Sequence, residues 1–149
     1  MPLPSRRGRL RWIGPALLLA GASCEGSGEA PRDVADRFMD LHYVVLDQAG
    51  ALEITSGLAR EKVRDEIRLL GDVRSGAELS ASRPRISYAF LQRSDLDDGG
   101  ERWRYRLEIK AGEGIAIARD VFLTLRRDAA GWRVANFVEM ESAGGPTGG

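Results

Sequence analysis

The sequence predicts an α+β fold in which two N-terminal helices pack on a four-stranded antiparallel sheet. Apolar side chains recur at helical spacing over residues 31–70, whereas from Arg85 onward they alternate with polar ones, as in strands. Short turns rich in Gly and Asp separate the strand-like runs. Helices followed by strands indicate an α+β domain, in which the helices cover one face of the sheet.

The first 23 residues predict an export signal. Four arginines and no acidic residue precede an apolar run from Trp12 to Ala22. This run is shorter than the roughly 20 residues that a membrane-spanning helix needs, and the pattern is typical of a signal peptide. The segment Leu19–Cys24 resembles a bacterial lipobox, so we expect Cys24 to carry a lipid. Cleavage after Ala22 is the alternative and gives a periplasmic or secreted form.

The rest of the chain divides into three parts. Residues 24–30 predict a flexible Gly-rich tether, residues 31–141 the folded domain, and residues 142–149 a disordered tail. Without residues 1–23 the chain has 18 basic and 22 acidic residues, a net charge of −4. This balance argues against nucleic acid as a partner. In a Gram-negative cell, Glu25 after a lipid-modified Cys24 implies sorting to the outer membrane.

Two helices are expected at the start of the folded domain. Pro31 suits a first helical position, and this helix should run to about Asp47. Thr55 can cap a second helix, which should end at Gly71. The expected apolar stripes are Val34, Phe38, Leu41 and Val45 in the first helix, and Ala59, Val63, Ile67 and Leu70 in the second.

Four strands follow in the prediction. The clearest is Trp103–Lys110, in which apolar and charged residues alternate strictly. A strand around Ile86–Phe90 precedes it, and two more follow, containing Ile117, Val121, Leu123 and Leu125, and then Trp132, Val134 and Val138. Because short turns join them, the strands should form an antiparallel meander.

This order of elements resembles the NTF2-like superfamily, also called cystatin-like α+β. The helix start Pro31–Phe38 and the closing hairpin Leu123–Phe137, with its Gly-Trp-Arg-Val step, carry the resemblance, which extends over Pro31–Glu141. It implies a strongly curved sheet with the helix pair in its hollow. The superfamily includes isomerases, dehydratases, transport adaptors and binding modules, so the resemblance does not select a function.

Five polar residues are candidates to line a pocket in that hollow. His42 is the single histidine, and without further ligands near it in sequence it predicts no metal site. The alternative is a structural role for all five, in which Asn136 marks a bulge that turns Phe137 inward. No acidic residue falls on the apolar strand faces, which argues against an isomerase-like acid pair. The candidates are His42, Tyr88, Tyr105, Arg119 and Asn136.

Arginines gather on the polar side of the predicted strands. We expect Glu108, Glu139 and Glu141 to balance them, which gives a solvated sheet face. If the arginines cluster instead, an acidic partner can dock there. These arginines are Arg102, Arg104, Arg106, Arg126, Arg127 and Arg133.

The leading functional prediction is a lipoprotein of the cell envelope that uses an NTF2-like domain to bind a protein partner or a small apolar ligand. No catalytic residue and no cofactor is predicted. Two alternatives stay open at this point. One is a metal-independent enzyme that uses the five pocket candidates, and the other is a structural module that forms a homodimer through its sheet.

Overall fold

The computed structural model describes residues 28–74, 84–112 and 115–142. The predicted signal segment, Cys24, Glu25 and positions 143–149 lie outside this part of the chain. Among the helices that it does describe, none has the length and apolar character needed to cross a membrane.

The helices occupy residues 31–74. Helix α1 (Pro31–Met39) continues directly into a π-helical segment, η1 (Asp40–Val45), and is followed by a short α2 (Gln48–Glu53) and a long α3 (Gly57–Arg74). Pro31 is at the start of α1, as predicted. The expectation of two N-terminal helices is wrong in two respects, because the helices lie in the middle of the chain and α2 is an additional element.

The π-helical segment changes which residues face the core. A π-helix closes its hydrogen bonds over five residues rather than four, so the sequence periodicity of an α-helix no longer applies. Tyr43 is therefore buried beside His42, whereas Val45, expected in the apolar stripe, is 64% exposed. The segment ends at Leu46, whose backbone is left-handed with φ of 60°.

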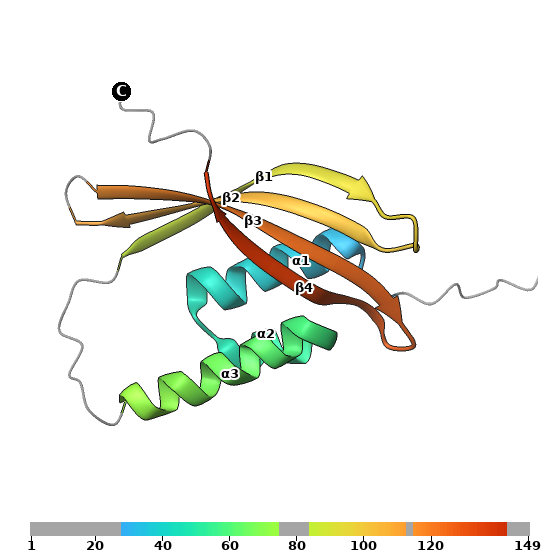
Figure 1. The fold of residues 1–149 in the computed structure, drawn as a ribbon, viewed down its shortest axis with the longest axis horizontal. Helices are drawn as coiled ribbons and strands as arrows, with labels where there is room; N and C mark the ends of the chain where they lie inside the picture. The colour runs from blue at the N-terminus through green and yellow to red at the C-terminus, as the bar shows by residue number, and fades with distance from the viewer. Residues whose placement is uncertain (1–27, 75–83, 113–114, 143–149) are drawn as a thin grey trace, which may run out of the picture.

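The strands form one antiparallel sheet in chain order, as predicted. Its members are β1 (Arg85–Asp95), β2 (Glu101–Ala111), β3 (Ile115–Asp128) and β4 (Gly131–Glu141), and each pairs with the next. All helices lie on one side of this twisted sheet (Figure 1). We call that side the inner face and the opposite side the outer face. The predicted α+β class is therefore confirmed at the level of a four-stranded antiparallel sheet with helices.

Two bulges change the side-chain alternation in the edge strands. In β1 the register shifts between Phe90 and Gln92, and in β4 it shifts around Ala135, because Val134 pairs with Leu125 and Asn136 with Thr124. One extra residue moves every later side chain of that strand to the opposite face. The β4 bulge turns Phe137 inward, where it is 5% exposed.

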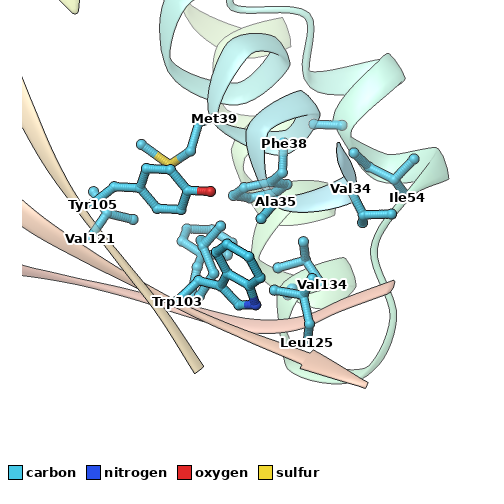
Figure 2. Packing of buried hydrophobic residues seen from close by; sticks show 14 of the residues in the cluster. Val34, Ala35, Phe38, Met39, Ile54, Trp103, Tyr105, Val121, Leu125 and Val134 are labelled. Atoms are coloured by element: carbon cyan, nitrogen blue, oxygen red, sulfur yellow. The ribbon is translucent and has the colours of Figure 1, made fainter. Parts of the chain in front are cut away.

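The core fills the space between α1 and the inner face. Figure 2 shows side chains of α1 packed against aromatic and aliphatic side chains of the sheet. The α3 helix contributes through Ala59 and Val63, while its later apolar residues Ile67 and Leu70 stay 37% and 40% exposed. The largest fully buried side chains are Tyr105, Phe38, Met39, Leu107, Leu123 and Leu125.

Candidate functional site

The inner face holds two polar clusters at the boundary between helices and sheet. Between these clusters Phe38 and Met39 of α1 pack against the sheet. Their partners there are Tyr105, Leu107 and Val121, and each of these five side chains is at most 1% exposed. Buried apolar side chains of this kind pack closely in protein interiors. What the polar groups can do therefore depends on which hydrogen bonds they already form.

The first cluster joins α1 to strands β1 and β2. Tyr105 Oη donates a 2.6 Å hydrogen bond to Asp36 Oδ1, and Arg32 Nε donates at 2.7 Å to the other oxygen of that carboxylate. Tyr88 Oη donates to Asp40 Oδ1 at 3.0 Å. The two tyrosine rings meet edge to face with centroids 5.7 Å apart. The structure thus brings Tyr88 and Tyr105 together, and their hydroxyls hold the helix on the sheet.

Both hydroxyls are kept in their neutral form. Burial and the hydrogen bond to Asp40 raise the pKa of Tyr88 to about 12. Burial, followed by the bond to Asp36, raises the pKa of Tyr105 well above its ordinary value. A tyrosine whose pKa lies this high does not act as a base or nucleophile near neutral pH. In this neutral form both hydroxyls act as hydrogen-bond donors to the carboxylates of α1 and η1.

The second cluster surrounds His42. The imidazole is 6% exposed and stacks on Phe38, with centroids 5.0 Å apart and planes at 14°. Its Nε2 donates a 2.7 Å hydrogen bond to Glu66 Oε2 of α3. Its Nδ1 is buried and has no partner among the described residues. Since neither nitrogen is open to a reactant, the His42–Glu66 pair lacks the access that a general base requires.

Tyr43 and Lys62 extend this second cluster to β4. Tyr43 Oη donates to Glu139 Oε1 at 2.9 Å, and burial followed by the charge of Glu139 raises the pKa of Tyr43. Lys62 Nζ donates to the backbone oxygen of Phe137 at 2.6 Å and to Asn136 Oδ1 at 3.0 Å. These bonds connect η1 and α3 to the last strand.

The remaining two candidates lie apart from these clusters' tyrosines and histidine. By strand register Asn136 pairs with Thr124 on the outer side of β4, and its amide oxygen accepts the bond from Lys62 at the sheet edge. This matches the alternative in which Asn136 marks a bulge that turns Phe137 inward. Arg119 is half-buried in β3, opposite Leu107 and Glu141, and forms no side-chain hydrogen bond with any described residue. The five candidates therefore do not form one pocket.

The sequence did not reveal which carboxylates accept the hydrogen bonds of the buried tyrosines and of His42. Asp36 and Glu66 come from helices, and only the three-dimensional packing brings them to Tyr105 and His42. Glu139 reaches the inner face through the β4 bulge, against the expectation that no acidic residue lies there. In the sequence, the interruption of the apolar pattern at Asn136 was the one signal that could have located this bulge.

A buried carboxylate also lies on the outer face. Asp120 is 3% exposed and pairs with Arg104 Nη2, with Arg106 Nε at 3.2 Å and with Ser142 Oγ at 2.8 Å. Burial opposes ionisation, but the hydrogen bonds from Arg104, Ser142 and Arg106 outweigh it and lower the pKa of Asp120. Ser142, assigned by the sequence to the tail, thus contacts the sheet.

Two surface hollows lie among the described residues. One, of about 300 Å³, is formed by the start of α2 and the far end of α3, with Leu46, Ile67 and Leu70 as its apolar walls. The other, of about 190 Å³, lies between β1 and β2 beside Leu91 and Arg106. Three or more metal-ligating side chains do not converge anywhere in the described part of the chain.

Comparison with known proteins gives little further information. No protein-family model matches the chain, and no curated protein matches it. Among solved structures, the chain is similar to one titled "Crystal structure of intermembrane space region of chloroplast protein ARC6". That similarity has 10% identity and a TM-score of 0.41 and covers 76% of this chain and 98% of the other.

Proposed function

We propose that this protein is an exported lipoprotein, anchored to the cell envelope through a lipid on Cys24, whose NTF2-like domain binds a protein partner at its surface. The signal-like first 23 residues and the position of Cys24 support the anchor. The order of helices and strands and the hairpin around Leu123–Phe137 support the NTF2-like assignment.

One observation favours binding over catalysis. The hollow that would hold a substrate in an NTF2-like enzyme is filled by Phe38, Met39 and Tyr105. The polar groups around it hold one another, as His42 does with Glu66. Binding is then left to the surfaces of the domain, where partner recognition needs no interior cavity.

The anchor is tested by mass spectrometry of the mature protein isolated from envelope membranes of the source organism. We expect Cys24 as the first residue, carrying acyl chains. An unmodified Cys24, or a chain that begins at Ser23, would remove the anchor from the proposal and leave a soluble exported domain.

Surface binding is tested by photo-crosslinking in living cells. A photoreactive amino acid is introduced at exposed positions of the full-length protein, one on the outer face at Arg102 and one on α3 at Arg64. A surface binder should give a discrete adduct at one of the two faces. Adducts at neither face would contradict the proposal.

A small apolar ligand is the second candidate function. The 300 Å³ hollow beside Leu46, Ile67 and Leu70 favours it, because apolar walls and a few polar groups are typical of ligand sites. Replacing Ile67 with Lys should abolish uptake of an environment-sensitive apolar dye. Unchanged dye fluorescence in that variant would exclude this site.

A further inference from the structure

The outer face of the sheet is strongly basic, which corresponds to the alternative of clustered arginines that the sequence left open. Cross-strand partners share a face, so the register identifies every strand residue that points outward. Seven basic and three acidic side chains do so, in a mature chain with more acidic than basic residues. We call these seven the basic face: Arg85, Arg102, Arg104, Arg106, Lys110, Arg126 and Arg133.

The β4 bulge produces this excess charge. Of the three acids expected to balance the arginines, only Glu108 remains outside, because the extra residue Ala135 sends Glu139 and Glu141 to the inner face. Of the other two outward acids, Asp120 is buried beneath its arginines, and Asp128 lies at the end of β3, where it accepts a 2.8 Å hydrogen bond from the Ala130 amide. Arg127 has also moved to the inner side, opposite Trp132.

Like charges oppose one another on the basic face. Arg85 pairs with Lys110 and Arg126 with Arg133, and such directly opposed like charges are destabilising in an antiparallel sheet. Asp98 relieves Arg126 through a 2.5 Å ion pair, and Arg133 donates a 2.7 Å hydrogen bond to the backbone oxygen of Glu53. Arg85, Lys110 and the exposed Arg102 form no ion pair with any described residue. An acidic ligand would relieve this repulsion.

The spacing of the arginines fits an extended chain. Arg102, Arg104 and Arg106 are alternate residues of β2, so their Cα atoms lie about 6.7 Å apart. Alternate side chains of an extended peptide have the same spacing. Asp120 holds the guanidinium groups of Arg104 and Arg106 in place, which reduces the conformational entropy lost on binding.

A hollow lies next to this row of charges. It has a volume of about 190 Å³, lies between β1 and β2, and is lined by Ser87, Tyr88, Ala89, Leu91, Arg106 and Glu108. The neighbouring strand β1 is at the end of the strand order, so its outer edge pairs with no described strand. A peptide can therefore approach along β1 while its acidic side chains reach the basic face.

We propose that the basic face docks an extended acidic segment of a protein partner. This inference rests on the proposed binding function and names the surface and the chemistry of the partner. Charge complementarity selects this occupant over a second copy of the chain, because two basic faces would repel each other. A homodimer through this face of the sheet is accordingly disfavoured.

An anionic membrane is the competing occupant, and the proposed anchor argues against it. Residues 24–30 span at most about 25 Å when fully extended, and they lead into Pro31 at the start of α1. Helix α1 lies on the inner side of the sheet, opposite the basic face (Figure 1). A tether that leaves from the helix layer favours an orientation in which this layer, and not the outer face, lies nearest the lipid surface.

The test uses the full-length protein and a fluorescein-labelled synthetic peptide in which glutamate alternates with serine. Fluorescence anisotropy should show binding that weakens as salt rises from about 0.05 M to about 0.3 M, as expected for exposed charges. The double variant Arg102→Gln/Lys110→Gln should bind about tenfold more weakly, the effect of losing two exposed ion pairs. Both side chains are exposed, so the fold should be retained.

The matched control is Arg60→Gln/Arg64→Gln, which removes the same charge from exposed positions of α3. It should bind the peptide with unchanged affinity. An equal loss in both double variants would indicate a general charge effect and overturn the inference, as would no binding of the peptide by the wild-type protein.

Vesicles distinguish the membrane alternative. Flotation with phosphatidylcholine vesicles, with and without phosphatidylserine, should show no binding that depends on Arg102 and Lys110. Binding to the anionic vesicles that the double variant loses would assign the face to lipid instead. If the protein forms crosslinked adducts in cells but does not bind the peptide, the proposed surface binding stands and the acidic-segment inference is refuted.

Discussion

Replacing Tyr105 with Phe tests whether the polar groups of the inner face are structural. The side chain is fully buried, and its hydroxyl donates a 2.6 Å hydrogen bond to the Asp36 carboxylate. A hydrogen bond to a charged group contributes about 1.5–3 kcal/mol. Because Phe leaves almost no cavity and Asp36 keeps its bond from Arg32, we expect a loss of about 2 kcal/mol.

Urea denaturation of the full-length protein measures this loss. With an m-value of about 2 kcal/mol per M, the midpoint should fall by about 1 M. In an Asp36→Ala background the Tyr105 hydroxyl is buried without a partner, so the same replacement should then be neutral or stabilising. An equal cost in both backgrounds, or no cost in the wild type, would refute the reasoning.

The same variant should alter the alkaline limit of stability. A tyrosine whose pKa is raised on folding contributes stability that is complete below the unfolded pKa, near 10, and is lost as the pH rises through the folded pKa. For Tyr88 this window is about pH 10 to 12, and Tyr105 shifts in the same direction. Tyr105→Phe should therefore lose less stability across this window than the wild type does.

Three further changes test other contacts. Glu66→Ala leaves His42 without a partner at Nε2 and should cost about 1–2 kcal/mol in urea denaturation; the His42 interpretation fails if stability is unchanged. Asp120→Asn should cost about 1–2 kcal/mol, because its arginine partners are partly exposed. The lowered pKa of Asp120 means that its contribution is present above about pH 4 and is lost as the pH falls through the folded pKa, so thermal unfolding should show a flatter acid limb in this variant. Replacing Phe137, which the bulge turns inward, with Ala should cost about 3–5 kcal/mol, whereas Val138→Ala on the outer face, where the side chain is 44% exposed, should cost less than about 1 kcal/mol. Equal stability of the last two variants would contradict the role of the bulge.

Sequence reasoning located the strands because their signal is local. The strict alternation in β2 follows from one apolar and one solvated face, and the residues from Trp103 to Leu107 obey it in the structure. The start of α1 at Pro31 follows from proline chemistry and was equally predictable.

The errors arise where one extra residue shifts the periodicity. The π-helical segment buries Tyr43 and exposes Val45, although an α-helical pattern predicts otherwise. The β4 bulge moves Asn136 outward and Glu139 inward. Such features depend on tertiary packing, since the same local sequence can continue as regular structure without it.

The partners of the polar groups were not predictable for a related reason. Glu66 lies 24 residues from His42, and Asp36 lies 69 residues from Tyr105. No periodicity connects positions so far apart. The basic face was predictable only in part. The row of arginines in β2 was visible in the sequence, but the loss of its acidic partners depends on the β4 bulge.

Backbone amide chemical-shift mapping of the full-length protein, titrated with the alternating glutamate–serine peptide, tests the central claim most directly. We expect the amide chemical shifts to change along Arg102–Lys110 and in the adjoining β1. The amide shifts of α1 and of His42 should stay unchanged. Shifts at His42 and in α1, with β2 unaffected, would show that the ligand enters the helix–sheet interior and would contradict both the packed hollow and the role of the basic face.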